Sequence, residues 1–94
     1  MSLNAQWMQR DLNVLWHPCT QMAEHPDTLP LLPICSGQGI WLEDINGKRY
    51  IDAISSWWVN LLGHAHAGIA RGITAQLERL PHVMLAGCTH EPAV

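Results

Sequence analysis

The stretch Ile51-Asp-Ala-Ile-Ser-Ser-Trp-Trp-Val-Asn-Leu-Leu-Gly-His-Ala-His66 places two adjacent tryptophans after two serines and ends on a Gly-His-Ala-His turn. If the backbone here is extended, Trp57 and Trp58 point to opposite faces, because successive side chains of a strand alternate. One ring can then fill a core, while the other needs a second apolar environment, such as a partner chain or a ligand. Two interpretations stay open: both rings are core residues, or one of them lines a binding pocket.

A β-hairpin is predicted just before this stretch. Residues 40–43 and 49–53 read as its two strands, and Asn46-Gly47 supplies the positive φ that a tight hairpin turn needs. Because an isolated hairpin is marginal in water, we expect a sheet of three or more strands. Residues 29–34 contain repeated prolines and suit an extended segment or an edge strand, whereas residues 36–39 are expected to form a turn.

Two helices are predicted on either side of the hairpin. The first covers residues 4–16, with Asn4 as its N-cap, and must end before Pro18. The second covers residues 67–80 and carries one apolar stripe, made by Ile69, Ile73, Leu77 and Leu80. The segment is therefore expected to be α+β: an N-terminal helix, a small antiparallel hairpin sheet and one amphipathic helix.

Composition narrows the class of protein. Ninety-four residues allow one small domain, and charged residues make up only 14% against a usual ~25%. Such a low charge suggests that part of the surface contacts other protein. The five Lys and Arg residues are scattered and form no basic patch, so we expect no nucleic-acid partner. Three cysteines without C-x-x-C spacing fit a reducing cytosol, and neither a signal peptide nor a membrane span is expected.

Residue chemistry alone gives no complete catalytic set. Four side chains could in principle bind zinc: His64, His66, Cys88 and His90. Their spacing is not that of a structural zinc site, so loop and cap histidines are the expected alternative. Asp44 and Asp52 are expected to be solvated strand ends rather than a general acid–base pair. Cys19 is either a reactive thiol or a small buried apolar residue.

Four phrases, in this order, resemble one enzyme family. They are Trp-His-Pro-Cys-Thr-Gln-Met at 16–22, Gly-Ile-Trp-Leu-Glu-Asp at 39–44, Asp-Ala-Ile-Ser-Ser-Trp-Trp-Val-Asn at 52–60 and His-Val-Met-Leu-Ala-Gly-Cys-Thr-His-Glu-Pro at 82–92. The chain is similar to the start of the adenosylmethionine–8-amino-7-oxononanoate aminotransferases, the diaminopelargonate synthases of biotin biosynthesis. These belong to the class III, pyridoxal-phosphate-dependent aminotransferases of fold type I, an α/β fold.

The resemblance implies what the whole enzyme does. It would transfer an amino group from S-adenosylmethionine to 8-amino-7-oxononanoate, forming 7,8-diaminononanoate, as a cytoplasmic homodimer that carries pyridoxal phosphate. Residues 1–94 would be part of its small domain, without the large cofactor-binding domain. Lys48, beside the hairpin turn, is expected to be a solvated charge and not the Schiff-base lysine. We therefore expect no catalytic, cofactor-binding or metal residue here, and no activity from this chain alone.

The resemblance also implies two substrate-binding residues. Trp57 matches the family's substrate-contacting tryptophan, and Cys19 stands where some members have a substrate-recognising tyrosine. His66-Ala67 departs from the expected Asn-Pro helix start, a loss expected to cost about 1 kcal/mol of helix stability. The alternative to the enzyme is a truncated, non-catalytic paralogue that acts as a protein-interaction module.

Overall fold

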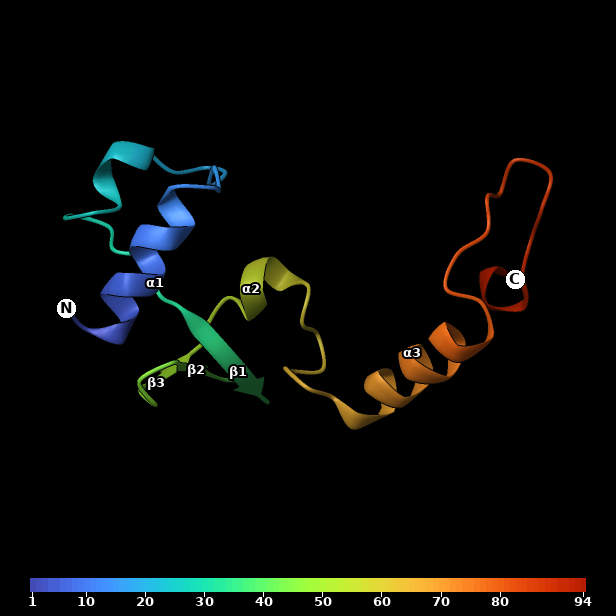
Figure 1. The fold of residues 1–94 in the computed structure, drawn as a ribbon. Coiled ribbons are helices and arrows are strands. Elements are labelled where there is room, and N and C mark those ends of the chain that lie inside the picture. The colour runs from blue at the N-terminus through green and yellow to red at the C-terminus, as the bar shows by residue number, and fades with distance from the viewer. The chain divides into compact units, whose positions relative to one another are not determined.

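The computed structural model describes residues 1–94, which divide into two compact units, Met1–His64 and Ala65–Val94 (Figure 1). The first unit contains α1 (Leu3–Leu12), η1 (Met22–Glu24), β1 (Ile34–Gln38), β2 (Trp41–Asp44), β3 (Arg49–Ile51) and α2 (Ser55–Trp58). The second contains α3 (Ala67–Arg79) and η2 (Glu91–Ala93). The predicted combination of helices with a small antiparallel sheet is confirmed.

The sheet is antiparallel, with strand order β1-β2-β3, so the expected third strand is present. The predicted turn is also present: Gly47 has φ 82° and its N–H donates to the Asp44 carbonyl at 2.9 Å. The turn predicted at residues 36–39 is wrong, because residues 36–38 pair with β2 as part of β1. The chain instead reverses at Gly39, whose φ of 58° suits glycine.

Helix α1 begins and ends earlier than predicted. Its N-cap is Ser2, whose hydroxyl accepts the Ala5 N–H at 3.2 Å, and not Asn4. The Asn4 side chain is used elsewhere, since its amide donates to Asp44 Oδ2 at 3.0 Å. The helix ends at Leu12, where the Asp11 carbonyl accepts the N–H groups of both Val14 and Leu15 at 2.9 Å.

The tryptophan pair does not lie on extended backbone, so the alternation argued from the sequence is wrong. After β3 the chain forms α2, one helical turn in which four consecutive residues have positive φ: Ser55 (50°), Ser56 (48°), Trp57 (68°) and Trp58 (68°). This is a left-handed turn. Both rings are exposed, Trp57 by 58% and Trp58 by 81%, so neither fills a core in this chain.

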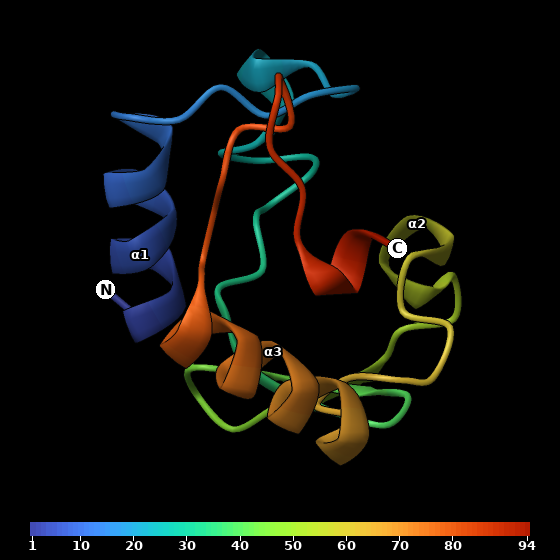
Figure 2. The same cartoon turned by 90° about the vertical axis from the view of Figure 1, so that its right-hand side faces the viewer.

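Helix α3 is present as predicted. The loss of its N-cap, expected because His66 replaces asparagine, is not seen. His66 Nδ1 accepts the Ile69 N–H at 3.3 Å, so the imidazole caps the helix where asparagine was expected. Beyond Leu80 a loop without regular secondary structure leads to η2 (Figure 2). Arg79 and Glu91 form an ion pair at 3.2 Å within this second unit.

The chain has no buried apolar side chain; the buried residues are His25 and Asp44. Even the apolar stripe of α3 is exposed, by 48% at Ile69 and 57% at Ile73 and Leu77. Exposed apolar surface of this kind is what the low charge led us to expect of a chain that contacts other protein through part of its surface. No helix combines the length and hydropathy needed to cross a membrane.

Candidate functional site

The α2 turn is held by Asp52, which follows β3. Asp52 Oδ1 accepts the Ser56 N–H at 2.9 Å, and Oδ2 accepts the Ser56 hydroxyl and His64 Nε2–H, both at 2.7 Å. The side chains of Asp52 and His64 are only 7% and 16% exposed. The sequence-based view of Asp52 as a solvated strand end is therefore wrong.

Hydrogen bonds also set the charge of this carboxylate. The Ser56 hydroxyl and N–H, followed by His64, hold the pKa of Asp52 at about 2, below its ordinary value of 3.8. Asp52 is thus ionised at neutral pH. It anchors its three donors and is not suited to exchange protons there.

His64 in turn is fixed on both sides. Its Nε2 lies 2.7 Å from Asp52 Oδ2, and its Nδ1 lies 3.4 Å from the Asn60 side-chain amide nitrogen. Its backbone pairs with Gly39 in both directions, at 2.8 and 3.0 Å. Gly63 has φ 82°, and a β-carbon there would lie 3.0 Å from the Gly39 backbone. The Gly-His pair therefore packs tightly on the connection between β1 and β2.

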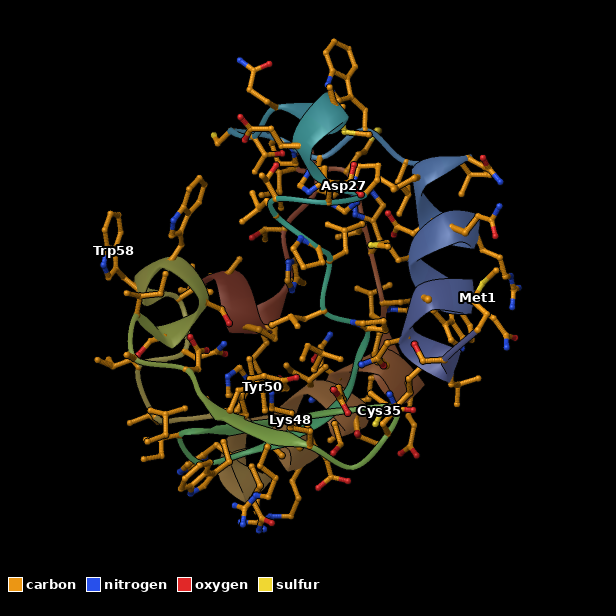
Figure 3. All side chains as sticks on the ribbon, turned by 90° about the vertical axis from the view of Figure 1, so that its left-hand side faces the viewer. Met1, Asp27, Cys35, Lys48, Tyr50 and Trp58 are labelled. Carbon is orange, nitrogen blue, oxygen red and sulfur yellow. The ribbon has the colours of Figure 1, made fainter.

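The turn presents its aromatic rings outward. Figure 3 shows Trp58 projecting away from α2. Exposed apolar neighbours extend the surface along the chain: Ile54, Val59, Leu61 and Leu62. Broad, flat aromatic surface of this kind can pack against the apolar part of a ligand or another protein. Trp57 is thus exposed, and the substrate contact that the family resemblance implies for it stays a prediction.

Cys19, the other predicted substrate-binding residue, lies elsewhere in the first unit. It is exposed with φ 58° and lines a shallow hollow with Thr20, Gln21, Glu24 and Leu29. Trp57 does not line this hollow. Two residues of this hollow, Thr20 and Leu29, are hydrogen-bonded to the buried His25. The Nδ1–H of His25 donates to the Leu29 carbonyl at 2.9 Å, which leaves Nε2 to accept the Thr20 hydroxyl at 2.8 Å. Sequence reasoning missed His25, because no pattern marks a buried residue in a proline-rich loop.

Comparison with known proteins places the chain in a family. Residues 22–94 match the family described as aminotransferase class-III. The chain belongs to this family. It is 50% identical over 84 residues to the adenosylmethionine-8-amino-7-oxononanoate aminotransferase of Helicobacter pylori, covering 89% of this chain and 19% of that protein.

Solved aminotransferase structures agree. The aminotransferase of the same name from Methanocaldococcus jannaschii superposes with a TM-score of 0.86 at 39% identity, covering 94% of this chain and 20% of that one. The omega transaminase of Pseudomonas jessenii in complex with PMP superposes with a TM-score of 0.81 at 29% identity, covering 99% and 20%. The chain thus spans about one fifth of the length of these relatives, and the resemblance stated from the sequence is confirmed.

Lys48 was expected from the sequence to be a solvated charge. Lys48 is exposed at the hairpin turn, with its Nζ 5.1 Å from the centre of the Tyr50 ring. Its amine is therefore not buried in the way that would activate a Schiff-base lysine. The structure also groups no three potential metal ligands. Of the suggested zinc set, His64 is occupied by Asp52.

Asp44 is the second carboxylate for which the sequence-based view is wrong. It is 1% exposed and accepts hydrogen bonds from the Asn4 amide, the Tyr50 hydroxyl, and the N–H groups of Asn46 and Lys48. The Asn4 bond, followed by that from Lys48, lowers the pKa of Asp44 to about 2. Burial and the same carboxylate raise the pKa of Tyr50. Asp44 therefore ties α1 to the hairpin and has no free oxygen for chemistry.

Proposed function

We propose that the whole protein is an aminotransferase that moves an amino group from S-adenosylmethionine to 8-amino-7-oxononanoate, forming 7,8-diaminononanoate in biotin biosynthesis. One observation carries this proposal: relatives sharing the name adenosylmethionine-8-amino-7-oxononanoate aminotransferase match most of this chain at 34% to 50% identity. They come from organisms as distant as Helicobacter pylori and Methanocaldococcus jannaschii.

Within that enzyme, we assign residues 1–94 to part of the small domain and to one wall of the substrate site. The outward-facing Trp57 supports this role, since a flat apolar ring suits the aliphatic chain of the acceptor and the adenosyl group of the donor. A tryptophan-to-glycine variant of a thermostable omega transaminase, described as engineered for the synthesis of bulky amines, is also similar to this chain. Cys19 would contact substrate from its separate loop.

The amino transfer itself depends on groups outside this chain. When bound, pyridoxal phosphate supplies the electron sink for the reaction. The contribution of this chain is positional: Trp57 packs against substrate and excludes water, while Asp52 keeps its charge and holds the turn. We further propose a cytoplasmic homodimer whose ligands are small molecules, without a nucleic-acid or membrane partner.

Replacement of Trp57 tests the proposed wall. In the whole protein, Trp57→Ala should lower kcat/KM for one or both substrates by roughly 10- to 100-fold, mainly by raising KM, because it removes binding surface shared by ground and transition states. Product formation from both substrates, followed by mass spectrometry, gives these constants. Trp7→Ala is the matched control, because it removes an equal ring from α1, outside the turn.

Two outcomes would contradict the proposal in different ways. A correctly folded, cofactor-loaded whole protein that forms no 7,8-diaminononanoate would refute the reaction. An active protein in which Trp57→Ala leaves the steady-state constants for both substrates unchanged would refute the assigned wall.

A second candidate is the non-catalytic interaction module. The exposed apolar surface is compatible with it as well as with the enzyme, since such a surface can bind another protein. The reading frame beyond Val94 distinguishes the two: a continuing frame with a lysine-bearing cofactor domain supports the enzyme, and a stop codon supports the module.

A further inference from the structure

We propose that Asp52 and His64 are positioning residues for Trp57: together they hold the left-handed α2 turn and so fix the ring at the substrate site. This inference rests on the proposed function. It assigns to the pair a role in substrate recognition without contact with substrate.

The conformation of the turn needs an external cause. Each L-residue in a left-handed helix is disfavoured by roughly 1–2 kcal/mol, and four consecutive non-glycine residues adopt it here. The turn's own hydrogen bonds do not explain its hand. Those from Trp58 N–H to the Ile54 carbonyl (2.8 Å) and from Val59 N–H to the Ser55 carbonyl (3.1 Å) also form in a right-handed turn. Such backbone persists only where surrounding contacts enforce it.

Asp52 supplies those contacts at the residue next to Trp57. Its two oxygens accept the N–H and the hydroxyl of Ser56, at 2.9 and 2.7 Å. These two bonds restrict both the backbone torsions of Ser56 and its position. Because the carboxylate is ionised, these are charge-assisted bonds, which are stronger than neutral ones. A shift of Ser56 would carry Trp57 with it.

His64 anchors the carboxylate to the sheet. Its Nε2–H reaches Asp52 Oδ2 at 2.7 Å, while its backbone pairs with Gly39. A continuous set of hydrogen bonds therefore runs from the connection between β1 and β2 to the residue before Trp57. The position of the sheet thus restricts where the backbone before Trp57 lies.

The same geometry argues against a catalytic dyad. The Ser56 hydroxyl donates to Asp52 and not to His64, so it does not face a histidine base. His64 Nδ1 faces the Asn60 amide. Asp52 and His64 fit a positioning role and not that of a nucleophile and its base.

A double-mutant cycle in the whole enzyme separates positioning through Trp57 from a general structural effect. Asp52→Asn should lower kcat/KM for the affected substrate by roughly tenfold or more, because a misplacement of about 1 Å can cost about 100-fold. In the Trp57→Ala background the same change should cost less than about twofold, because the ring it positions is gone. Ser56→Ala, on an exposed residue, provides a milder second test should Asp52→Asn fold poorly.

Hydrogen exchange at the Ser56 amide gives a readout independent of activity. Asp52→Asn and His64→Ala should accelerate this exchange, and His64→Gln, which keeps a donor, should partly restore it. Asp44→Asn is the matched control, because this buried carboxylate contacts α1 and the hairpin but not the turn. It should leave both Ser56 exchange and the KM of the enzyme unchanged.

The outcomes separate the two proposals. An active wild type with equal losses from Asp52→Asn in both backgrounds, or with unchanged Ser56 exchange, would overturn the positioning role alone. An inactive wild type would overturn the proposed function and this inference with it.

Discussion

At the scale of single residues, two carboxylates organise the first unit. Asp44 joins segments forty positions apart through Asn4, and Asp52 joins β3 to His64, twelve positions away. Both were expected to be solvated strand ends, because sequence alone does not show which donors will surround a side chain. Their pKa values of about 2 are the electrostatic result of these bonds.

These shifts predict acid sensitivity with a definite sign. The unfolded carboxyls titrate near their ordinary pKa of 3.8, above their folded pKa of about 2, so the unfolded state binds more protons between these values. The stabilisation is present above about pH 4 and is lost as the pH falls through about 2. We expect the denaturation midpoint of the whole protein to fall as the pH is lowered from about 4 to about 2. This fall should be less steep in Asp44→Asn than in wild type, because the variant has no carboxyl to protonate at this position. The exposed Asp27→Asn serves as control; identical slopes in Asp44→Asn and wild type would contradict the assignment.

At the scale of elements, the sequence predicted the turns and helices that depend only on residues close together in the chain. The Asn46-Gly47 turn and the apolar stripe of α3 both depend on neighbouring residues, and both are where the sequence placed them. The α2 turn could not be predicted in this way. Left-handed backbone is disfavoured at each of its residues, and the contacts that select it come from Asp52 and from His64, beyond the turn.

Helix α3 offers a test of its glycines. A β-carbon at Gly72 would meet no atom within 4 Å, so Gly72→Ala should stabilise the helix by about 0.5–1 kcal/mol through backbone entropy alone. At Gly68 the same β-carbon would lie 3.1 Å from His66 Cε1, against the capping ring, so Gly68→Ala should gain less. Circular dichroism of peptides spanning residues 64–82 measures both. Equal gains would mean that the His66 cap does not crowd Gly68.

At the scale of the whole molecule, the chain exposes most of its apolar side chains and covers about one fifth of its relatives. Composition indicated this, because the charged fraction is too low for a small free-standing surface. What covers the apolar surface could not be read from these residues, since the covering surface would lie in other protein.

The isolated 94-residue chain is therefore expected to self-associate. Exposed apolar patches of more than a few hundred Å² drive association, and no apolar core opposes it. Sedimentation should show concentration-dependent oligomers that bind a hydrophobic dye. A compact monomer with a sharp, concentration-independent melting transition would contradict this and would favour the independent interaction module.

The central claim is that a left-handed turn, fixed by Asp52 and His64, places Trp57 against substrate in a class-III aminotransferase. A crystal structure of the whole enzyme with pyridoxal phosphate and the acceptor bound tests it most directly. We predict positive φ at residues 55–58 and the Trp57 ring within about 4 Å of the acceptor's aliphatic chain. A right-handed or extended segment there, or a Trp57 ring packed away from the acceptor, would contradict the account.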